Sequence, residues 1–239
     1  MTADLSVGNV LSRIFSIYGD QAGVLLPVAA VIFLVEAILS GLVASAGAIF
    51  ILVALPIQII ASTLYSGMVV ELVSDVQDGR RDHSIGSLFG AVSAVLVPLI
   101  LAGLVTGIAI AVGFVLLIVP GLILLTIFAV VAPAVVVERK GVFEAISRSR
   151  ELVSGNGLRV FAVIIVVFLL TLVLSAVVGA FVEDAGTAAR IAAEFVLSTL
   201  LAPVAALAAG VLYFELRRAR GEAGPSAAPG PDAAGAFGR

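Results

Sequence analysis

Residues 91–137 form an uninterrupted run of 47 positions without a single charged side chain. A helix needs about 20 apolar residues to cross the hydrocarbon core of a bilayer, so this run is too long for one span and suits two. We expect the turn between them near Thr106–Gly113. The whole chain is 62% hydrophobic and 12% charged, whereas about a quarter of a soluble domain is charged. The sequence therefore predicts an all-α integral membrane protein.

The apolar segments predict six transmembrane helices, arranged as three hairpins that are each preceded by a short amphipathic interfacial helix. The expected interfacial helices cover residues 5–18, 84–93 and 142–153, and a break near Asp20 is expected to end the first. The expected spans are residues 22–44, 48–70, 92–110, 113–137, 158–182 and 191–214. Residues 1–216 then form one membrane domain. The Ala/Gly/Pro-rich tail, residues 217–239, is predicted to be disordered.

The basic residues predict the orientation of these spans. With six spans and a cytoplasmic N-terminus, only Arg190 among the basic residues lies outside. Because cytoplasmic loops carry an excess of Lys and Arg, this asymmetry places both termini in the cytoplasm. We expect a multi-pass protein of the cell membrane.

Several functions lack the residues that they need. The chain has no cysteine and one histidine, His83, so we expect no metal site and no cofactor. There is no motif for a catalytic nucleophile or for phosphate binding, and no basic face for nucleic acid. We therefore expect a protein that is not an enzyme and does not bind nucleic acid.

Two kinds of residue within the spans could shape the helix bundle. The five prolines at positions 56, 98, 120, 133 and 203 each remove a backbone donor and can kink a helix. Kinks can line a cavity, although packing is their commoner role. Gly103 and Gly107 form a GxxxG pair that permits close helix contact.

Glu36 is the acid placed deepest within an expected span. A carboxylate at the bilayer centre costs about 2.5–3.5 kcal/mol on insertion scales, so it should face the bundle. It could form a proton, cation or polar-ligand site. Alternatively, it could be a structural hydrogen-bond partner of Gln58, Ser62 or Thr63 on the second span. Glu194 reads as a solvated helix end that could pair with Arg190.

A second candidate region is the charged segment that follows the fourth span. Glu138, Arg139 and Lys140 end the apolar run, and Arg148, Arg150 and Arg159 follow on or beside the 142–153 helix. Such a cluster could bind anionic lipid headgroups or dock a partner protein. It could also act only as a topology determinant. The membrane face of this helix is expected to carry Val142, Phe143, Ile146 and Val153.

The central motif resembles a known membrane family. Its matching residues are Pro120-Gly121, Ala132-Pro133, Glu138, Ala145-Ile146-Ser147-Arg148-Ser149, Leu152 and Gly155. They look like the membrane domain of glycerophosphoryl diester phosphodiesterases and its free-standing prokaryotic relatives, although Arg150 stands where an aromatic residue is usual. The resemblance implies a non-catalytic six-helix domain. In it, Pro120, Glu138, Arg148 and Ser149 would be structural positions, and Arg148 would pair with Glu138 or cap the carbonyls of the fourth span.

Two functions follow as hypotheses. The first is a membrane scaffold or anchor that senses lipids or docks a cytosolic or membrane protein through residues 138–159. The alternative is a small-solute or lipid transporter with a cavity near Glu36. The direction of the Glu36 side chain discriminates between them, because an open polar cavity favours transport and a closed bundle favours the scaffold.

Overall fold

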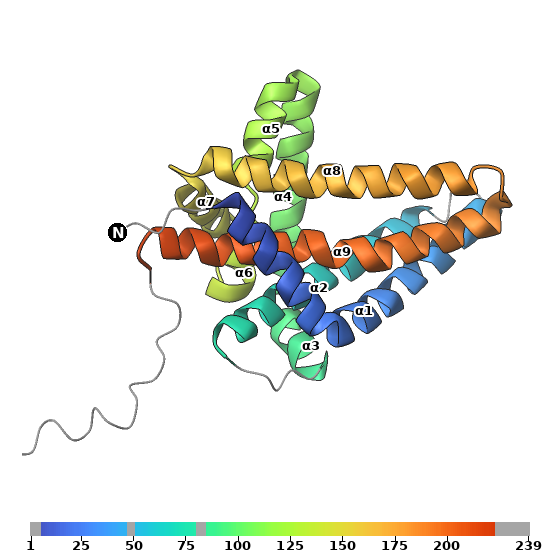
Figure 1. Cartoon of the computed structure of the whole chain (residues 1–239), viewed down its shortest axis with the longest axis horizontal. Helices are drawn as coiled ribbons and strands as arrows, with labels where there is room; N and C mark the ends of the chain where they lie inside the picture. The colour runs from blue at the N-terminus through green and yellow to red at the C-terminus, as the bar shows by residue number, and fades with distance from the viewer. Residues whose placement is uncertain (1–5, 47–50, 80–84, 223–239) are drawn as a thin grey trace, which may run out of the picture.

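The computed structural model describes residues 6–46, 51–79 and 85–222. Every regular element in these ranges is a helix, as Figure 1 shows. The helices are α1 (Val7–Ala46), α2 (Ile51–Gln77), α3 (Ile85–Ser93), α4 (Leu96–Leu116), α5 (Ile118–Ile127), α6 (Val131–Glu138), α7 (Val142–Val153), α8 (Gly157–Val182) and α9 (Gly186–Ala219). His83 and most of the predicted tail lie outside the described residues.

Six segments are long and apolar enough to cross a membrane, which confirms the predicted all-α class with six candidate spans. They are Val7–Leu39, Ala54–Gln77, Leu96–Leu116, Ile118–Glu138, Gly157–Val182 and Gly186–Ala219. In Figure 1, α8, α9, α2 and the later part of α1 run along the long axis of the molecule, while the α4–α5 hairpin stands across it. Helices α3 and α7 coincide with two of the predicted interfacial helices. Their location along a membrane surface stays a prediction.

The break expected near Asp20 is wrong. Helix α1 continues from Val7 to Ala46, with Pro27 inside it, and Figure 1 shows a change of direction along its length. A helical stripe runs through both of its parts, because Val10, Ile14, Ile17, Leu25 and Ala29 are all buried. This burial offsets the cost of about 1 kcal/mol for each interior glycine.

The turn between the third and fourth spans lies at Leu117 and not at Thr106–Gly113. Leu117 is extended, with φ −164° and ψ 153°. The hairpin closes tightly because a Cβ on Gly113 would lie 3.0 Å from the Gly121 Cα. A Cβ on Gly121 would lie only 2.4 Å from the Phe114 ring. Gly113 and Gly121 therefore provide the close helix contact that was expected of Gly103 and Gly107, which have open space around them.

Three of the five prolines start helices. Pro98, Pro120 and Pro133 are the third residues of α4, α5 and α6. An N–H in the first turn has no acceptor within its own helix, so proline costs little there and no kink follows. Pro56 and Pro203 do lie inside α2 and α9.

The core is centred on the second half of α9. Leu207, Val211, Leu212, Tyr213 and Leu216 are each at most 1% exposed. The start of α1, the end of α9 and α7 lie at one end of the molecule in Figure 1, which we call the polar end. Helix α9 continues to Ala219, beyond the predicted domain limit at residue 216.

Candidate functional site

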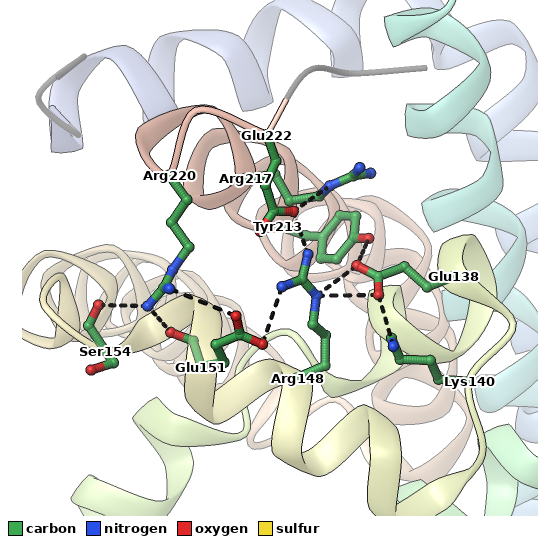
Figure 2. A network of polar contacts seen from close by, with 9 residues as sticks. All are labelled: Glu138, Lys140, Arg148, Glu151, Ser154, Tyr213, Arg217, Arg220 and Glu222. Atoms are coloured by element: carbon green, nitrogen blue, oxygen red, sulfur yellow. Dashed lines mark hydrogen bonds and ion pairs between the residues drawn. The ribbon is translucent and has the colours of Figure 1, made fainter. Parts of the chain in front are cut away.

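The polar end carries a network of charged side chains from α6, α7 and α9, shown in Figure 2. We call it the polar-end network. Its members are Glu138, Lys140, Arg148, Glu151, Ser154, Tyr213, Arg217, Arg220 and Glu222. Its members are up to 84 positions apart in the sequence. The network therefore holds α6, α7 and α9 together, although α9 is far from the other two helices along the chain.

Arg148 is the centre of the polar-end network. Its Nε donates to both carboxylate oxygens of Glu138, at 2.9 and 3.2 Å, which is the pairing expected from the sequence. Nη2 donates to Glu222, and Nη1 lies 3.2 Å from a Glu151 oxygen. Burial alone would lower the pKa of the Arg148 guanidinium, but the hydrogen bonds to Glu222 and Glu138 outweigh it and raise the pKa. The arginine therefore stays charged at any accessible pH.

Glu138 receives two further contacts. The Tyr213 hydroxyl donates to its Oε1 at 2.6 Å, and the Lys140 ammonium lies 3.5 Å from its Oε2. Hydrogen bonding from Arg148 holds the pKa of Glu222 below its usual range. Neither Tyr213 nor Glu222 was predicted as a site residue, because Tyr213 lies in an expected apolar span and Glu222 lies in the tail that was predicted to be disordered.

Local backbone geometry positions α6 and α7 for this network. Arg139 ends α6 in the left-handed conformation, with φ 55°. Its guanidinium donates to the Ala91 carbonyl at 2.7 Å and lies 3.9 Å from Glu71. The Gly141 N–H donates to Glu144 Oε2 at 3.4 Å, and this contact helps to start α7. The chain thus reverses between Glu138 and Arg148 with both side chains facing inward.

Ser149 explains why the fourth span is interrupted between α5 and α6. This side chain is fully buried, donates to the Ile127 carbonyl at 2.6 Å and accepts from the Val130 N–H at 3.3 Å. The interruption takes away the partners that these two backbone groups would have in a continuous helix, and the Ser149 hydroxyl replaces those partners. The buried face of α7 is formed by Ala145, Ser149, Leu152 and Val153. Phe143, expected at the membrane face, is 77% exposed.

The remaining predicted site residues lie outside the polar-end network. Pro120 and Gly121 lie in the α4–α5 hairpin, where Gly121 makes the close contact with Phe114. Arg150 is exposed and lines a cleft between α5 and α8. The basic segment therefore has two parts, one engaged in the polar-end network and one outside it.

Glu36 faces a cavity, as expected for a carboxylate in a span. Its carboxylate hydrogen-bonds to the Gln58 side chain, while its Oε1 is buried and has no partner among the described residues. The hydroxyl of Ser62 donates instead to the carbonyl of Gln58, at 2.8 Å. Glu36 and Gln58 line a small cavity of about 40 Å³ that also includes Glu194. Glu194 is exposed on α9, in agreement with a solvated position, and it also lines this cavity.

A larger cavity, which we call the α8–α9 cavity, adjoins the small one. Its volume is about 720 Å³, and it shares Phe33, Glu194 and Ser198 with the Glu36 cavity. Its polar lining comes from both helices and from the residue that follows α8, and it consists of Thr171, Ser175, Glu183, Arg190, Glu194 and Ser198. The sequence indicates Glu36 as a candidate site residue but does not indicate this cavity. The hydroxyl residues of α8 are spread along an almost wholly apolar helix and form no local cluster.

Within residues 6–46, 51–79 and 85–222, no group of three His, Cys, Asp or Glu side chains could hold a metal ion.

Comparison with known proteins places the chain in a family. Residues 42–209 match the model of an uncharacterised protein family, UPF0259. A UPF0259 membrane protein of Pectobacterium carotovorum is 34% identical over 112 residues, which cover 47% of this chain and 44% of that protein. No solved structure matches. Neither match links the chain to the glycerophosphoryl diester phosphodiesterases, so that part of the expected resemblance has no support, whereas a prokaryotic membrane family does. The chain belongs to the UPF0259 family of membrane proteins.

Proposed function

We propose that this chain is a lipid- or small-solute-handling membrane protein whose ligand occupies the α8–α9 cavity. The observation that carries the proposal is the polar lining of this open cavity of about 720 Å³, where hydroxyl and charged side chains lie beside the apolar residues of α8 and α9. Ligand pockets typically measure about 300–1,000 Å³. Polar residues in membrane spans are costly, and they commonly mark substrate pathways.

The charges in the cavity indicate the class of ligand. Glu183 and Glu194 oppose a single base, Arg190, and Glu36 lines the small cavity alongside. An excess of acid favours an ammonium group, and Arg190 suits a phosphate. The lining therefore fits a cationic or zwitterionic amphiphile, such as phosphatidylethanolamine, whose tails would lie among the apolar side chains of α8 and α9.

Native mass spectrometry with phosphatidylethanolamine and phosphatidylglycerol at equal concentration tests this proposal. We expect the wild-type protein to retain phosphatidylethanolamine selectively, and the double variant Glu36→Gln/Glu194→Gln to retain about tenfold less. Asp20→Asn is the matched control, because Asp20 is exposed on α1 and contacts only Ser16 among the residues described. Unchanged retention by the double variant would exclude the α8–α9 cavity as the binding site.

A scaffold role is the second candidate. The observation that favours it is that the polar-end network holds the inner side of α7 while Phe143 on its outer side is 77% exposed. A docked cytosolic or membrane protein would cover this aromatic side chain. The test is whether a stoichiometric protein copurifies with the wild type and is lost in Phe143→Ser. Retention of that protein by Phe143→Ser would exclude this surface.

We also propose that the polar end faces the cytoplasm. The basic residues of α7 and of the end of α9 lie there, whereas Arg190 lies at the opposite end, near the turn between α8 and α9. The chain has no native cysteine. Each single-cysteine variant therefore carries one thiol, and any labelling reports the position of that residue. A membrane-impermeant thiol reagent added to intact cells should label Ala185→Cys and spare Ser147→Cys. The reverse pattern would invert the orientation.

A further inference from the structure

A second cleft lies between α5, the end of α7 and the start of α8. Its volume is about 440 Å³. Apolar side chains form most of its wall, namely Val119, Leu122, Ile123, Ile127, Leu158 and Phe161. It shares no residue with the α8–α9 cavity, so what binds in one does not determine what binds in the other. We call it the α5–α8 cleft.

Arg150 is the charged residue that lines the α5–α8 cleft. Its neighbours are engaged: Arg148 belongs to the polar-end network, Arg159 donates to Asn156 Oδ1 at 3.0 Å, and Arg220 donates to the Ser154 carbonyl at 3.2 Å. The guanidinium of Arg150, in contrast, has no hydrogen bond or ion pair with any residue that the structure describes, although the Arg150 backbone carbonyl accepts from the Ser154 N–H. An exposed guanidinium is thus left at the edge of an apolar surface.

Unused backbone donors lie beside Arg150. The Asn156 carbonyl accepts from the N–H groups of Arg159 and Val160, and the Asn156 N–H donates to the Val153 carbonyl. The N–H groups of Gly155, Gly157 and Leu158 have no acceptor among the described residues, and all three residues line the α5–α8 cleft. They precede or begin the 26-residue helix α8, whose N-terminus favours an anion.

We infer that the α5–α8 cleft binds an anionic phospholipid, with the phosphate on Arg150 and the start of α8 and one acyl chain along the apolar wall. The position of Arg150 and the backbone amides beside the apolar wall determines which class of molecule can bind in the α5–α8 cleft. A free phosphate would satisfy Arg150 and the amides but would leave the apolar wall uncovered. An uncharged amphiphile would cover the wall and leave Arg150 without a counter-charge. The inference is independent of the ligand proposed for the α8–α9 cavity, whose lining is acidic.

The test uses the full chain in detergent micelles, with phosphatidylglycerol and phosphatidylcholine as competing probes read by native mass spectrometry. The wild type should retain phosphatidylglycerol selectively. Arg150→Gln should reduce that retention about fivefold, the effect of one basic residue at an anionic surface, and leave phosphatidylcholine unchanged. Ile123→Trp should reduce the binding of both lipids, because Ile123 is 52% exposed and a larger ring would fill the cleft without disturbing the core.

Arg218→Gln is the matched control, since it removes one charge at the same end of the molecule but outside the α5–α8 cleft. It should bind lipid as the wild type does. Arg150→Gln should melt at the wild-type temperature, because the Arg150 guanidinium has no partner in the described chain to lose. Equal retention of the two lipids by the wild type, or full phosphatidylglycerol retention by Arg150→Gln, would overturn the inference. The inference would also be overturned if glycerol phosphate displaced the bound lipid as effectively as phosphatidylglycerol does. Retention of a protein in place of lipid would have the same consequence.

Discussion

Replacing Arg148 by alanine should destabilise the fold through the carboxylate that it leaves behind. The side chains of Arg148 and Glu138 are only 14% and 17% exposed. Removing one partner of a buried ion pair costs about 3–5 kcal/mol. Two features reduce this figure: Lys140 still lies 3.5 Å from Glu138, and the Tyr213 hydroxyl still donates to it. The contact with Glu151, which is 56% exposed, adds at most about 1 kcal/mol. We therefore expect a loss of about 2–4 kcal/mol.

Unfolding in mixed micelles of dodecyl maltoside and sodium dodecyl sulfate, followed by circular dichroism, measures this loss. Arg218→Gln is the control, because its ion pair with Glu215 is more exposed and should be worth less than about 1 kcal/mol. A double-mutant cycle with Glu138→Gln and Arg148→Met isolates the pair, and its coupling energy should exceed 1 kcal/mol. An Arg148→Ala variant within about 0.5 kcal/mol of the wild type would refute a stabilising role for the network.

Three further predictions concern single side chains. Gly121→Ala should cost about 1–3 kcal/mol through overpacking against the Phe114 ring. Gly103→Ala, at a position inside α4 with open space around it, should instead raise the stability by up to about 1 kcal/mol in the same unfolding assay; an equal loss in both variants would contradict the hairpin contact. Ser149→Ala should cost about 2 kcal/mol, because it leaves two buried backbone groups unpaired, and the exposed Ser147→Ala should cost nothing; a neutral Ser149→Ala would show that other groups satisfy the interruption. The pKa of Glu222 is lowered in the folded protein, so this carboxylate stabilises the fold fully above its unfolded-state pKa of about 4.3, and the stabilisation is lost as the pH falls through the folded-state pKa. Glu222→Gln should therefore reduce the decline of the unfolding free energy below about pH 5. An unchanged slope of unfolding free energy against pH would contradict this.

Hydropathy predicted six long apolar helices correctly because a bilayer restricts a chain more strongly than water does. The fifth span was expected at residues 158–182 and α8 covers Gly157–Val182. Helix α7 has the predicted limits, since the polar and apolar residues of 142–153 alternate with the helical period. Where no charge interrupts the pattern, hydropathy cannot locate a turn. The α4–α5 turn was therefore misplaced, because its position depends on Gly113 meeting Gly121 across the hairpin.

The candidate sites were predictable only where one segment carried the signal. The Glu138–Arg148 pair joins residues ten positions apart in one charged segment, and it was one of the two roles expected for Arg148. Tyr213 and Glu222 approach Arg148 and Glu138 only after α9 packs against α6 and α7, which no local pattern specifies. The α8–α9 cavity likewise depends on the angle between two apolar helices. Its hydroxyl residues look unremarkable in the sequence because each one can bond its own helix, as Thr171 does with the Val167 carbonyl.

Site-specific photo-crosslinking in native membranes tests most directly whether the α8–α9 cavity is a binding site. A benzoylphenylalanine at Leu197 would lie in the cavity, and one at Val173, which is 56% exposed on α8, would report the surrounding lipid. We expect the probe at Leu197 to capture one class of amine-bearing amphiphile and Glu36→Gln/Glu194→Gln to abolish this adduct. The probe at Val173 should capture bulk lipid in both backgrounds. The same mixture of adducts at both positions, unaffected by the double variant, would contradict it.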